Sequence, residues 1–451
     1  MAAHTKIKPS QPMVNGFDGA EMNSLPARTQ DQIRRREDLL GPGYRLFYKN
    51  PVEIVRGQGT LLFDADGHDY LDVYNNVASV GHCHPRVVDA VSRQLATLNT
   101  NTRYLQESIL TYSRDLLDTL PRELAHVMFT CTGSEANDLA MRVARYATGN
   151  EGVIVTSGAY HGLTADVSSF SPSLGVGVPL GQNVRMITAP DNRRFGSGQG
   201  IVEHLRQEVR AAIADLARHG IGVAAFIADS IFSSDGIFSD PAGFLQPIIE
   251  EVHAAGGLYI ADEVQPGFGR TGDAWWGFQR HGIVPDIMTT GKPMGNGIPV
   301  AAAVFRPELL EEFGRNIRYF NTYGGNSVSI AAAQATLDVM RDEDLMGNAR
   351  RVGDYMLENI RTLSARYEQV AEVRGAGLFI GVDIVNDRTS NVPDGDSALA
   401  IVNAMRDRRV LISASGPEGN TLKVRPPLPF SIADADRLLE NMEIVMKAVL
   451  R

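Results

Sequence analysis

Short apolar runs alternate with helical patterns through the middle of this 451-residue chain, and this alternation restricts the possible folds most strongly. Amphipathic patterns at 202–220 and 243–257 separate some of the runs. The runs lie at 151–157, 184–190, 223–229, 257–264, 286–291 and 301–305. Continuous apolar strands with helical crossovers are typical of a mostly parallel sheet with helices on both faces. We therefore predict an α/β fold whose ligands bind beyond the carboxyl ends of the strands.

The character of the sequence changes near both ends. Residues 1–30 are polar with scattered Pro and Gly, which predicts a loose N-terminal arm. After residue 326, long helical patterns precede the strand-like LFIGVDIV and TLKVRPPL, which predicts a small α+β domain. We divide the chain into the arm (1–30), an N-terminal part of the small domain (31–75), a large domain (76–326) and the C-terminal small domain (327–451).

Composition excludes several classes of protein. The formal charge of −10 disfavours a nucleic-acid or anionic-membrane binder. Two cysteines imply no disulfide framework, and the start of the chain lacks a signal pattern, so we expect a cytoplasmic protein. No apolar run approaches the roughly 18 residues that span a bilayer.

Several segments carry residue types suited to a cofactor site. CTGSEAN looks like the start of a helix, with Thr132 and Glu135 in a capping-box pattern, so Gly133 and Ser134 could hold a phosphate. Asp262 ends an apolar strand, where a carboxylate can keep a pyridinium nitrogen protonated. Lys292 follows the next strand among glycines, where burial can activate its amine. Tyr160 in GAYHG could stack on a ring.

Each of these features has an ordinary alternative. A capped helix, a solvated strand end and a surface lysine would show the same local patterns. Two other motifs are rejected: the glycines of GFGRTG are not followed by a convincing helix, and the acid precedes them. His82, Cys83 and His84 are too close in sequence to chelate one ion, so we predict no metal site and a turn before Pro85.

The order of these segments resembles the class III aminotransferase family of fold type I, from about Leu40 to the C-terminus. The resemblance implies pyridoxal 5′-phosphate (PLP) as cofactor and a homodimer with shared active sites, and it leaves open whether dimers form tetramers. It implies the following roles: Lys292 forms the Schiff base, Asp262 pairs with the pyridine nitrogen, Gln265 reaches the phenolic oxygen, Tyr160 stacks on the ring, Gly133 and Ser134 hold the phosphate, and Thr322 reaches that phosphate from the partner subunit.

Within the family, YNNVASVGHCHPRVV, LNTNTRYL and TTGKPMGNGIPVA resemble the ethanolamine-phosphate phospho-lyase branch. Many class III transaminases have a Glu-Pro-x-x-Gly-Glu-type segment, whose second Glu can neutralise a carboxylate-binding arginine. Here the corresponding position is Ser234, which leaves Arg425 available to an anion. Arg425, Arg103 and Asn76 are our candidates for binding the substrate phosphate.

The resemblance implies elimination of phosphate from O-phosphoethanolamine, giving acetaldehyde, ammonia and phosphate. Lys292 would remove the proton from the carbon that bears the amine. The first alternative is an aminotransferase that uses alanine or another amine with glyoxylate or pyruvate. The second is a binding protein without catalysis, which could dispense with Lys292 or Asp262.

Overall fold

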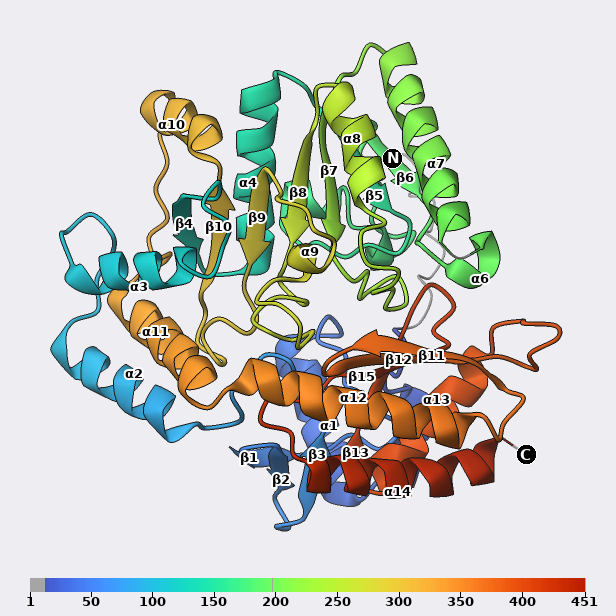
Figure 1. Cartoon of the computed structure of the whole chain (residues 1–451). Helices are drawn as coiled ribbons and strands as arrows, with labels where there is room; N and C mark the ends of the chain where they lie inside the picture. The colour runs from blue at the N-terminus through green and yellow to red at the C-terminus, as the bar shows by residue number, and fades with distance from the viewer. Residues whose placement is uncertain (1–12, 197, 451) are drawn as a thin grey trace, which may run out of the picture.

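The computed structural model describes residues 13–196 and 198–450, and a seven-stranded sheet forms the upper half of the molecule in Figure 1. Its strands follow the order β4 (His126–Thr130), β10 (Ala301–Phe305), β9 (Ile287–Thr290), β8 (Leu258–Asp262), β7 (Val223–Asp229), β5 (Gly152–Thr156) and β6 (Val184–Ile187). β10 runs antiparallel to both of its neighbours, whereas β9, β8, β7, β5 and β6 pair in parallel. The predicted mostly parallel α/β sheet is confirmed.

Helices cover both faces of this sheet, because successive residues of a strand point to opposite sides. Val153 and Ile260 belong to one buried cluster with residues of α4 (Gly133–Thr148). Ile154 and Tyr259 belong to another, with residues of α7 (Gln199–Arg218) and α8 (Gln246–Ala254). Figure 1 shows α7 and α8 beside the β5–β8 strands.

The lower half of Figure 1 is a smaller α+β part with two four-stranded sheets. One sheet has the order β1 (Ile54–Gln58), β2 (Leu61–Asp64), β3 (Asp69–Asp72) and β13 (Val410–Leu411). The other has the order β11 (Val370–Ala376), β12 (Phe379–Ile384), β15 (Thr421–Val424) and β14 (Ser413–Ser415). β3 pairs in parallel with β13, so strands from opposite ends of the chain share one sheet.

The remaining helices connect or cover these sheets. They are α1 (Ala27–Leu40), α2 (Pro85–Thr97), α3 (Glu107–Leu117), α5 (Ala165–Ser168), α6 (Asn192–Phe195), α9 (Gly277–Arg280), α10 (Pro307–Asn316), α11 (Ser327–Asp342), α12 (Leu345–Ser364), α13 (Gly395–Asp407), α14 (Ile432–Val449) and the 3-10 helices Gly19–Ser24 and Pro172–Leu174. Among the described residues, no helix combines the length and apolar character needed to cross a bilayer.

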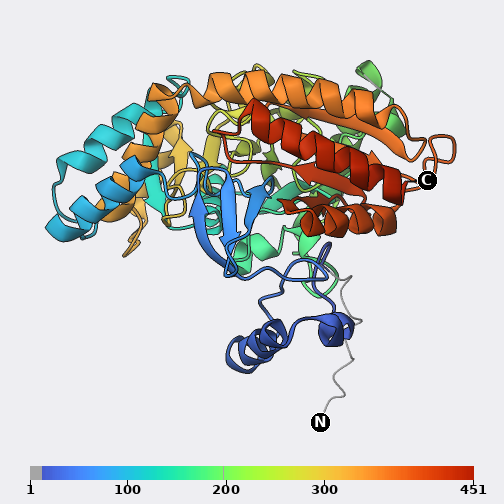
Figure 2. The ribbon, with the colours of Figure 1, turned by 90° about the horizontal axis from the view of Figure 1, so that it is seen from below.

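The predicted N-terminal arm lies partly outside the described residues, which begin at Met13. Its described part is tied to the segment that follows α1, since the Phe17 amide donates to the carbonyl of Leu46 and the Tyr48 amide donates to that of Asn15. α1 already begins at Ala27, inside the predicted arm, and Figure 2 shows it standing away from the rest of the chain.

Candidate active site

A cavity of about 330 Å³ lies where the carboxyl ends of β7, β8 and β9 meet the start of α4. Six residues proposed from the sequence line it together: Gly133, Ser134, Tyr160, Asp262, Gln265 and Lys292. Asp229 also lines it, because β7 and β8 pair with Asp229 opposite Asp262. The parallel sheet therefore brings segments 160 residues apart to one edge, as expected for a ligand site in this fold.

The N-terminus of α4 forms one wall of the cavity. Thr132 caps the helix, and its hydroxyl accepts a hydrogen bond of 3.2 Å from the Glu135 amide. The second half of the predicted capping box is wrong, because the Glu135 carboxylate accepts from the amide of Cys131 at 2.7 Å instead. A β-carbon on Gly133 would lie 2.9 Å from a methyl group of Val264, so only glycine fits without a shift. Free amides at such a helix start suit a phosphate.

Asp262 is held in place by two side chains that the sequence analysis did not single out. Its Oδ2 lies 2.7 Å from Nδ1 of His161 and accepts from the amide of Asn137 at 2.9 Å. Asn137 in turn accepts a hydrogen bond of 2.6 Å from the hydroxyl of Thr289. Only Asn137 left a sequence signal, as a polar residue on the otherwise apolar buried face of α4. This network fixes the direction of the carboxylate before any ligand arrives.

Lys292 lines the cavity, and its side chain is exposed to it. Partial desolvation at the wall of the cavity, and then the nearby guanidinium of Arg425, lower the pKa of Lys292 to about 8. Its amine makes no hydrogen bond to any residue that the structure describes. An unpaired amine with a depressed pKa is suited to form a Schiff base or to take up a proton.

Arg425 directly follows β15, and it is 5% exposed. Its Nε donates to the carbonyl of Tyr74 at 3.0 Å, and its Nη1 donates to Oε1 of Gln265. Within residues 13–196 and 198–450 it forms no ion pair, and the side chain of Ser234 supplies no carboxylate. A charge buried without a counter-ion is costly unless a ligand completes the pair.

A second buried basic side chain, Lys423, lies two residues away in the sequence, and the sequence analysis missed it. Its amine donates to the carbonyl of Ser233 at 2.8 Å. Burial, and then Arg425, lower the pKa of Lys423 well below its ordinary value. Because alternate residues of a strand share a face, the spacing of Lys423 and Arg425 in TLKVR was a signal that could have identified it.

The three remaining candidates do not line the cavity. Asn76 is 1% exposed, and neither atom of its side-chain amide has a hydrogen-bond partner. It lies two residues after Tyr74, which binds Arg425, and one before Val77, which lines the cavity. Arg103 is exposed, with its guanidinium 3.8 Å from the centre of the Phe320 ring. Thr322 is exposed in the single chain.

The rejected motifs lie outside the lining of the cavity. GFGRTG forms a turn before the four-residue helix α9, and His84 precedes Pro85, the first residue of α2.

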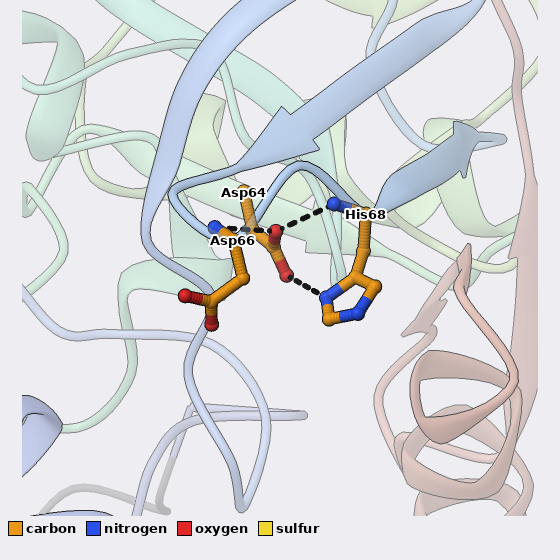
Figure 3. Close-up of side chains that lie close together, drawn as sticks. All are labelled: Asp64, Asp66 and His68. Atoms are coloured by element: carbon orange, nitrogen blue, oxygen red, sulfur yellow. Dashed lines mark hydrogen bonds and ion pairs between the residues drawn. The ribbon is translucent and has the colours of Figure 1, made fainter.

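Asp64, Asp66 and His68 lie close together at the β2–β3 turn, as Figure 3 shows. There the Asp64 carboxylate accepts hydrogen bonds from the backbone amides of Asp66 and His68, and it also contacts the His68 ring. These hydrogen bonds explain why the three side chains lie close together.

Comparisons with known proteins identify the class. Residues 47–446 match the family described as Aminotransferase class-III. The protein named alanine–glyoxylate aminotransferase 2-like from Drosophila melanogaster is 40% identical over 433 residues, covering 93% of this chain and 88% of the relative. Ethanolamine-phosphate phospho-lyase homolog 1 from Caenorhabditis elegans is 36% identical over 428 residues, covering 90% and 91%. A solved phospholyase from Arthrobacter, in complex with phosphoethanolamine, is 44% identical with a TM-score of 0.89, covering 93% of this chain and 100% of that one.

The fold and the site therefore define a PLP-dependent enzyme of fold type I. This chain belongs to the class III aminotransferase family, and its cofactor is PLP. The residues of the cavity fit that cofactor: a helix start with no room for a side chain at Gly133, a fixed carboxylate at Asp262 and a free amine at Lys292. The family includes lyases and aminotransferases, so the class alone leaves the reaction open.

Proposed function

We propose that this enzyme is a phospho-lyase that eliminates phosphate from O-phosphoethanolamine, and that one water molecule then hydrolyses the remaining two-carbon amine to acetaldehyde and ammonia. The observation that carries the proposal is the buried Arg425, which has no carboxylate partner among the described residues and lies beside Gln265 of the cavity. The Lys423 amine adds hydrogen-bonding capacity close to Arg425 in the chain, and the unpartnered Asn76 amide adds donor and acceptor capacity. The 44% identity to a phospholyase that was solved with phosphoethanolamine supports the same substrate.

The side chains of the cavity would divide the reaction among them. Bound PLP would supply an electron sink next to the carbon that carries the amine. Asp262, held by His161 and Asn137, would keep the proton on the pyridine nitrogen. Lys292, neutral above a pH of about 8, would take the proton from the substrate carbon at its Nζ. Arg425 would stabilise the charge of the departing phosphate.

The proposed assembly is a homodimer, in which Thr322 of one subunit would reach the cofactor phosphate of the other. The exposure of Thr322 in the single chain is compatible with this role. We also propose that the enzyme works in the cytoplasm without nucleic-acid or membrane partners, on the basis of its composition, and fractionation of cells that express it tests this location.

Incubating the pure holoenzyme with phosphoethanolamine and no keto acid tests the reaction. Acetaldehyde and inorganic phosphate should form in equal amounts over many turnovers. Product that forms only after glyoxylate or pyruvate is added would instead establish the aminotransferase, which the 40% identity to the Drosophila relative favours as second candidate. No turnover with either mixture would leave a protein that binds PLP without this chemistry.

Replacing Arg425 with Ala tests its role separately. Loss of a charged hydrogen-bonding group should raise KM for phosphoethanolamine about tenfold to a hundredfold, while a neutral amine of similar size loses much less. Arg366→Ala is the matched control, since Arg366 lies on the surface of the small part, where it pairs with Glu443. Equal losses for both substrates in Arg425→Ala would contradict the phosphate role.

A further inference from the structure

Asp235 is a buried carboxylate in the turn that follows β7, and no role in the proposed reaction uses it. It is 4% exposed and accepts two hydrogen bonds of 2.8 Å each. Its Oδ2 accepts from the hydroxyl of Thr156, the last residue of β5, and its Oδ1 accepts from the backbone amide of Gly158. Both donors lie at the start of the loop that carries Tyr160 into the cavity.

This loop is fixed at both ends, and Asp235 provides the first attachment. A β-carbon on Gly158 would lie 2.8 Å from Oδ1 of Asp235, so the carboxylate packs directly against the backbone of Gly158. At the far end, Asn137 donates to the carbonyl of His161 at 2.7 Å, and Ser134 accepts from the amide of Leu163 at 3.1 Å. Tyr160 lies between these attachments, so their positions determine where its ring stands.

The turn that carries Asp235 is itself held by the small part of the molecule. Lys423 and Ser415 both donate to the carbonyl of Ser233, at 2.8 and 3.1 Å. Arg374 donates to the carbonyl of Ile237 at 2.7 Å. Asp235 therefore connects the Tyr160 loop to a turn whose backbone is anchored from the other sheet.

Keeping a carboxylate at this point is costly. Burial raises the pKa of Asp235 to about 6, against the opposing effect of the hydrogen bonds from Thr156 and Gly158. Of the titratable groups around it, Asp229 opposes its ionisation and His161 favours it. An uncharged side chain would avoid much of this cost if filling the space were the only requirement.

We propose that Asp235 is a positioning residue that sets the Tyr160 ring against the cofactor by holding the amide of Gly158. The inference rests on the proposed stacking role of Tyr160 and on PLP as cofactor, but not on the choice between lyase and aminotransferase. If so, the affinity for PLP and the circular dichroism of the bound cofactor depend on Asp235, although it is proposed to touch neither the ring nor the phosphate of PLP.

The test measures PLP binding rather than turnover. Asp235→Ala should increase the rate at which the holoenzyme releases PLP by about tenfold and weaken the circular dichroism of the bound cofactor, because two hydrogen bonds to a charged group are lost. Asp235→Asn can still accept from Gly158 and pair with Thr156, so it should release PLP at close to the wild-type rate. Asn420→Ala is the matched control, since it removes a buried 2.8 Å bond to Ile384 in the small sheet.

A double-mutant cycle with Tyr160→Leu separates positioning from general stability. If Asp235 acts through the ring, Asp235→Ala should change PLP release little once Tyr160 is Leu. Additive effects, or a wild-type release rate in Asp235→Ala, would overturn the proposal. Asp235→Leu keeps a side chain of similar shape but removes both acceptor oxygens, including the one that holds Gly158, and it provides the same comparison if Asp235→Ala does not fold.

Discussion

At the residue scale, the chemistry of the cavity follows from burial of charged groups at strand ends. Burial lowers the pKa values of Lys423 and Arg425 below their ordinary range, and partial desolvation at the wall of the cavity lowers that of Lys292. The charge of Arg425 lowers the pKa of both lysines further. Burial also raises the pKa of Asp229, with Asp262 nearby. An anionic ligand would offset the positive charge of Arg425, as the proposed phosphorylated substrate requires.

The lowered pKa of Lys292 makes a testable prediction for cofactor uptake. Only the neutral amine attacks the PLP aldehyde, so the rate at which the apoenzyme regains PLP should rise with pH and level off above a pH of about 8. Stopped-flow absorbance at the cofactor band measures this rate, and Lys292→Ala is the control that should show no covalent phase. A rate that continues to rise to the pH of an ordinary lysine, about 10.4, would contradict the assigned environment.

At the element scale, close packing rather than helix propensity decides which residues are tolerated. α12 crosses the turn between β11 and β12 so closely that a β-carbon on Gly353 would lie 2.3 Å from backbone atoms of Gly377. By contrast, Gly314 in α10 is exposed, and no atom lies within 4 Å of the corresponding position. Glycine is therefore required by close packing at position 353, whereas at position 314 the space would accept a larger side chain.

These two glycines form a matched pair of substitutions. Gly353→Ala should lower the free energy of unfolding by about 1–3 kcal/mol, because the clash outweighs the better helix propensity of Ala. Gly314→Ala should raise it by about 0.5–1 kcal/mol, since only propensity changes. Urea denaturation followed by circular dichroism measures both, and a stabilised Gly353→Ala variant would show that α12 can move away from the turn.

At the scale of the whole molecule, the proposed dimer accounts for apolar side chains that the single chain leaves in solvent. Tyr104 and Leu105 are 67% and 102% exposed and belong to the segment that carries Arg103. Through Arg103, this segment lies against Phe320, two residues before Thr322. A second subunit placed here would bury these side chains and bring its own Thr322 region to the shared surface.

Charge introduced at this surface should therefore break the assembly. Wild-type protein should have twice the 49.0 kDa mass of one chain by light scattering, whereas Leu105→Asp should shift toward one chain and bind PLP more weakly. Ile444→Asp is the control, because Ile444 is 49% exposed on α14 of the small part. A Leu105→Asp variant that keeps the dimer and its PLP would place the interface elsewhere.

The sequence by itself determined the features that depend on local order along the chain. Apolar runs and amphipathic periods predicted the strands and helices of the large sheet, and the strand ends located Asp262 and Lys292. Only the tertiary structure decided which distant side chains support them. His161, Asn137, Lys423 and Asp235 act through contacts with residues tens to hundreds of positions away, and such contacts leave little trace in a local pattern. The contacts of the predicted arm could not be read from local sequence either, because its described residues Asn15 and Phe17 bond to Tyr48 and Leu46, beyond α1.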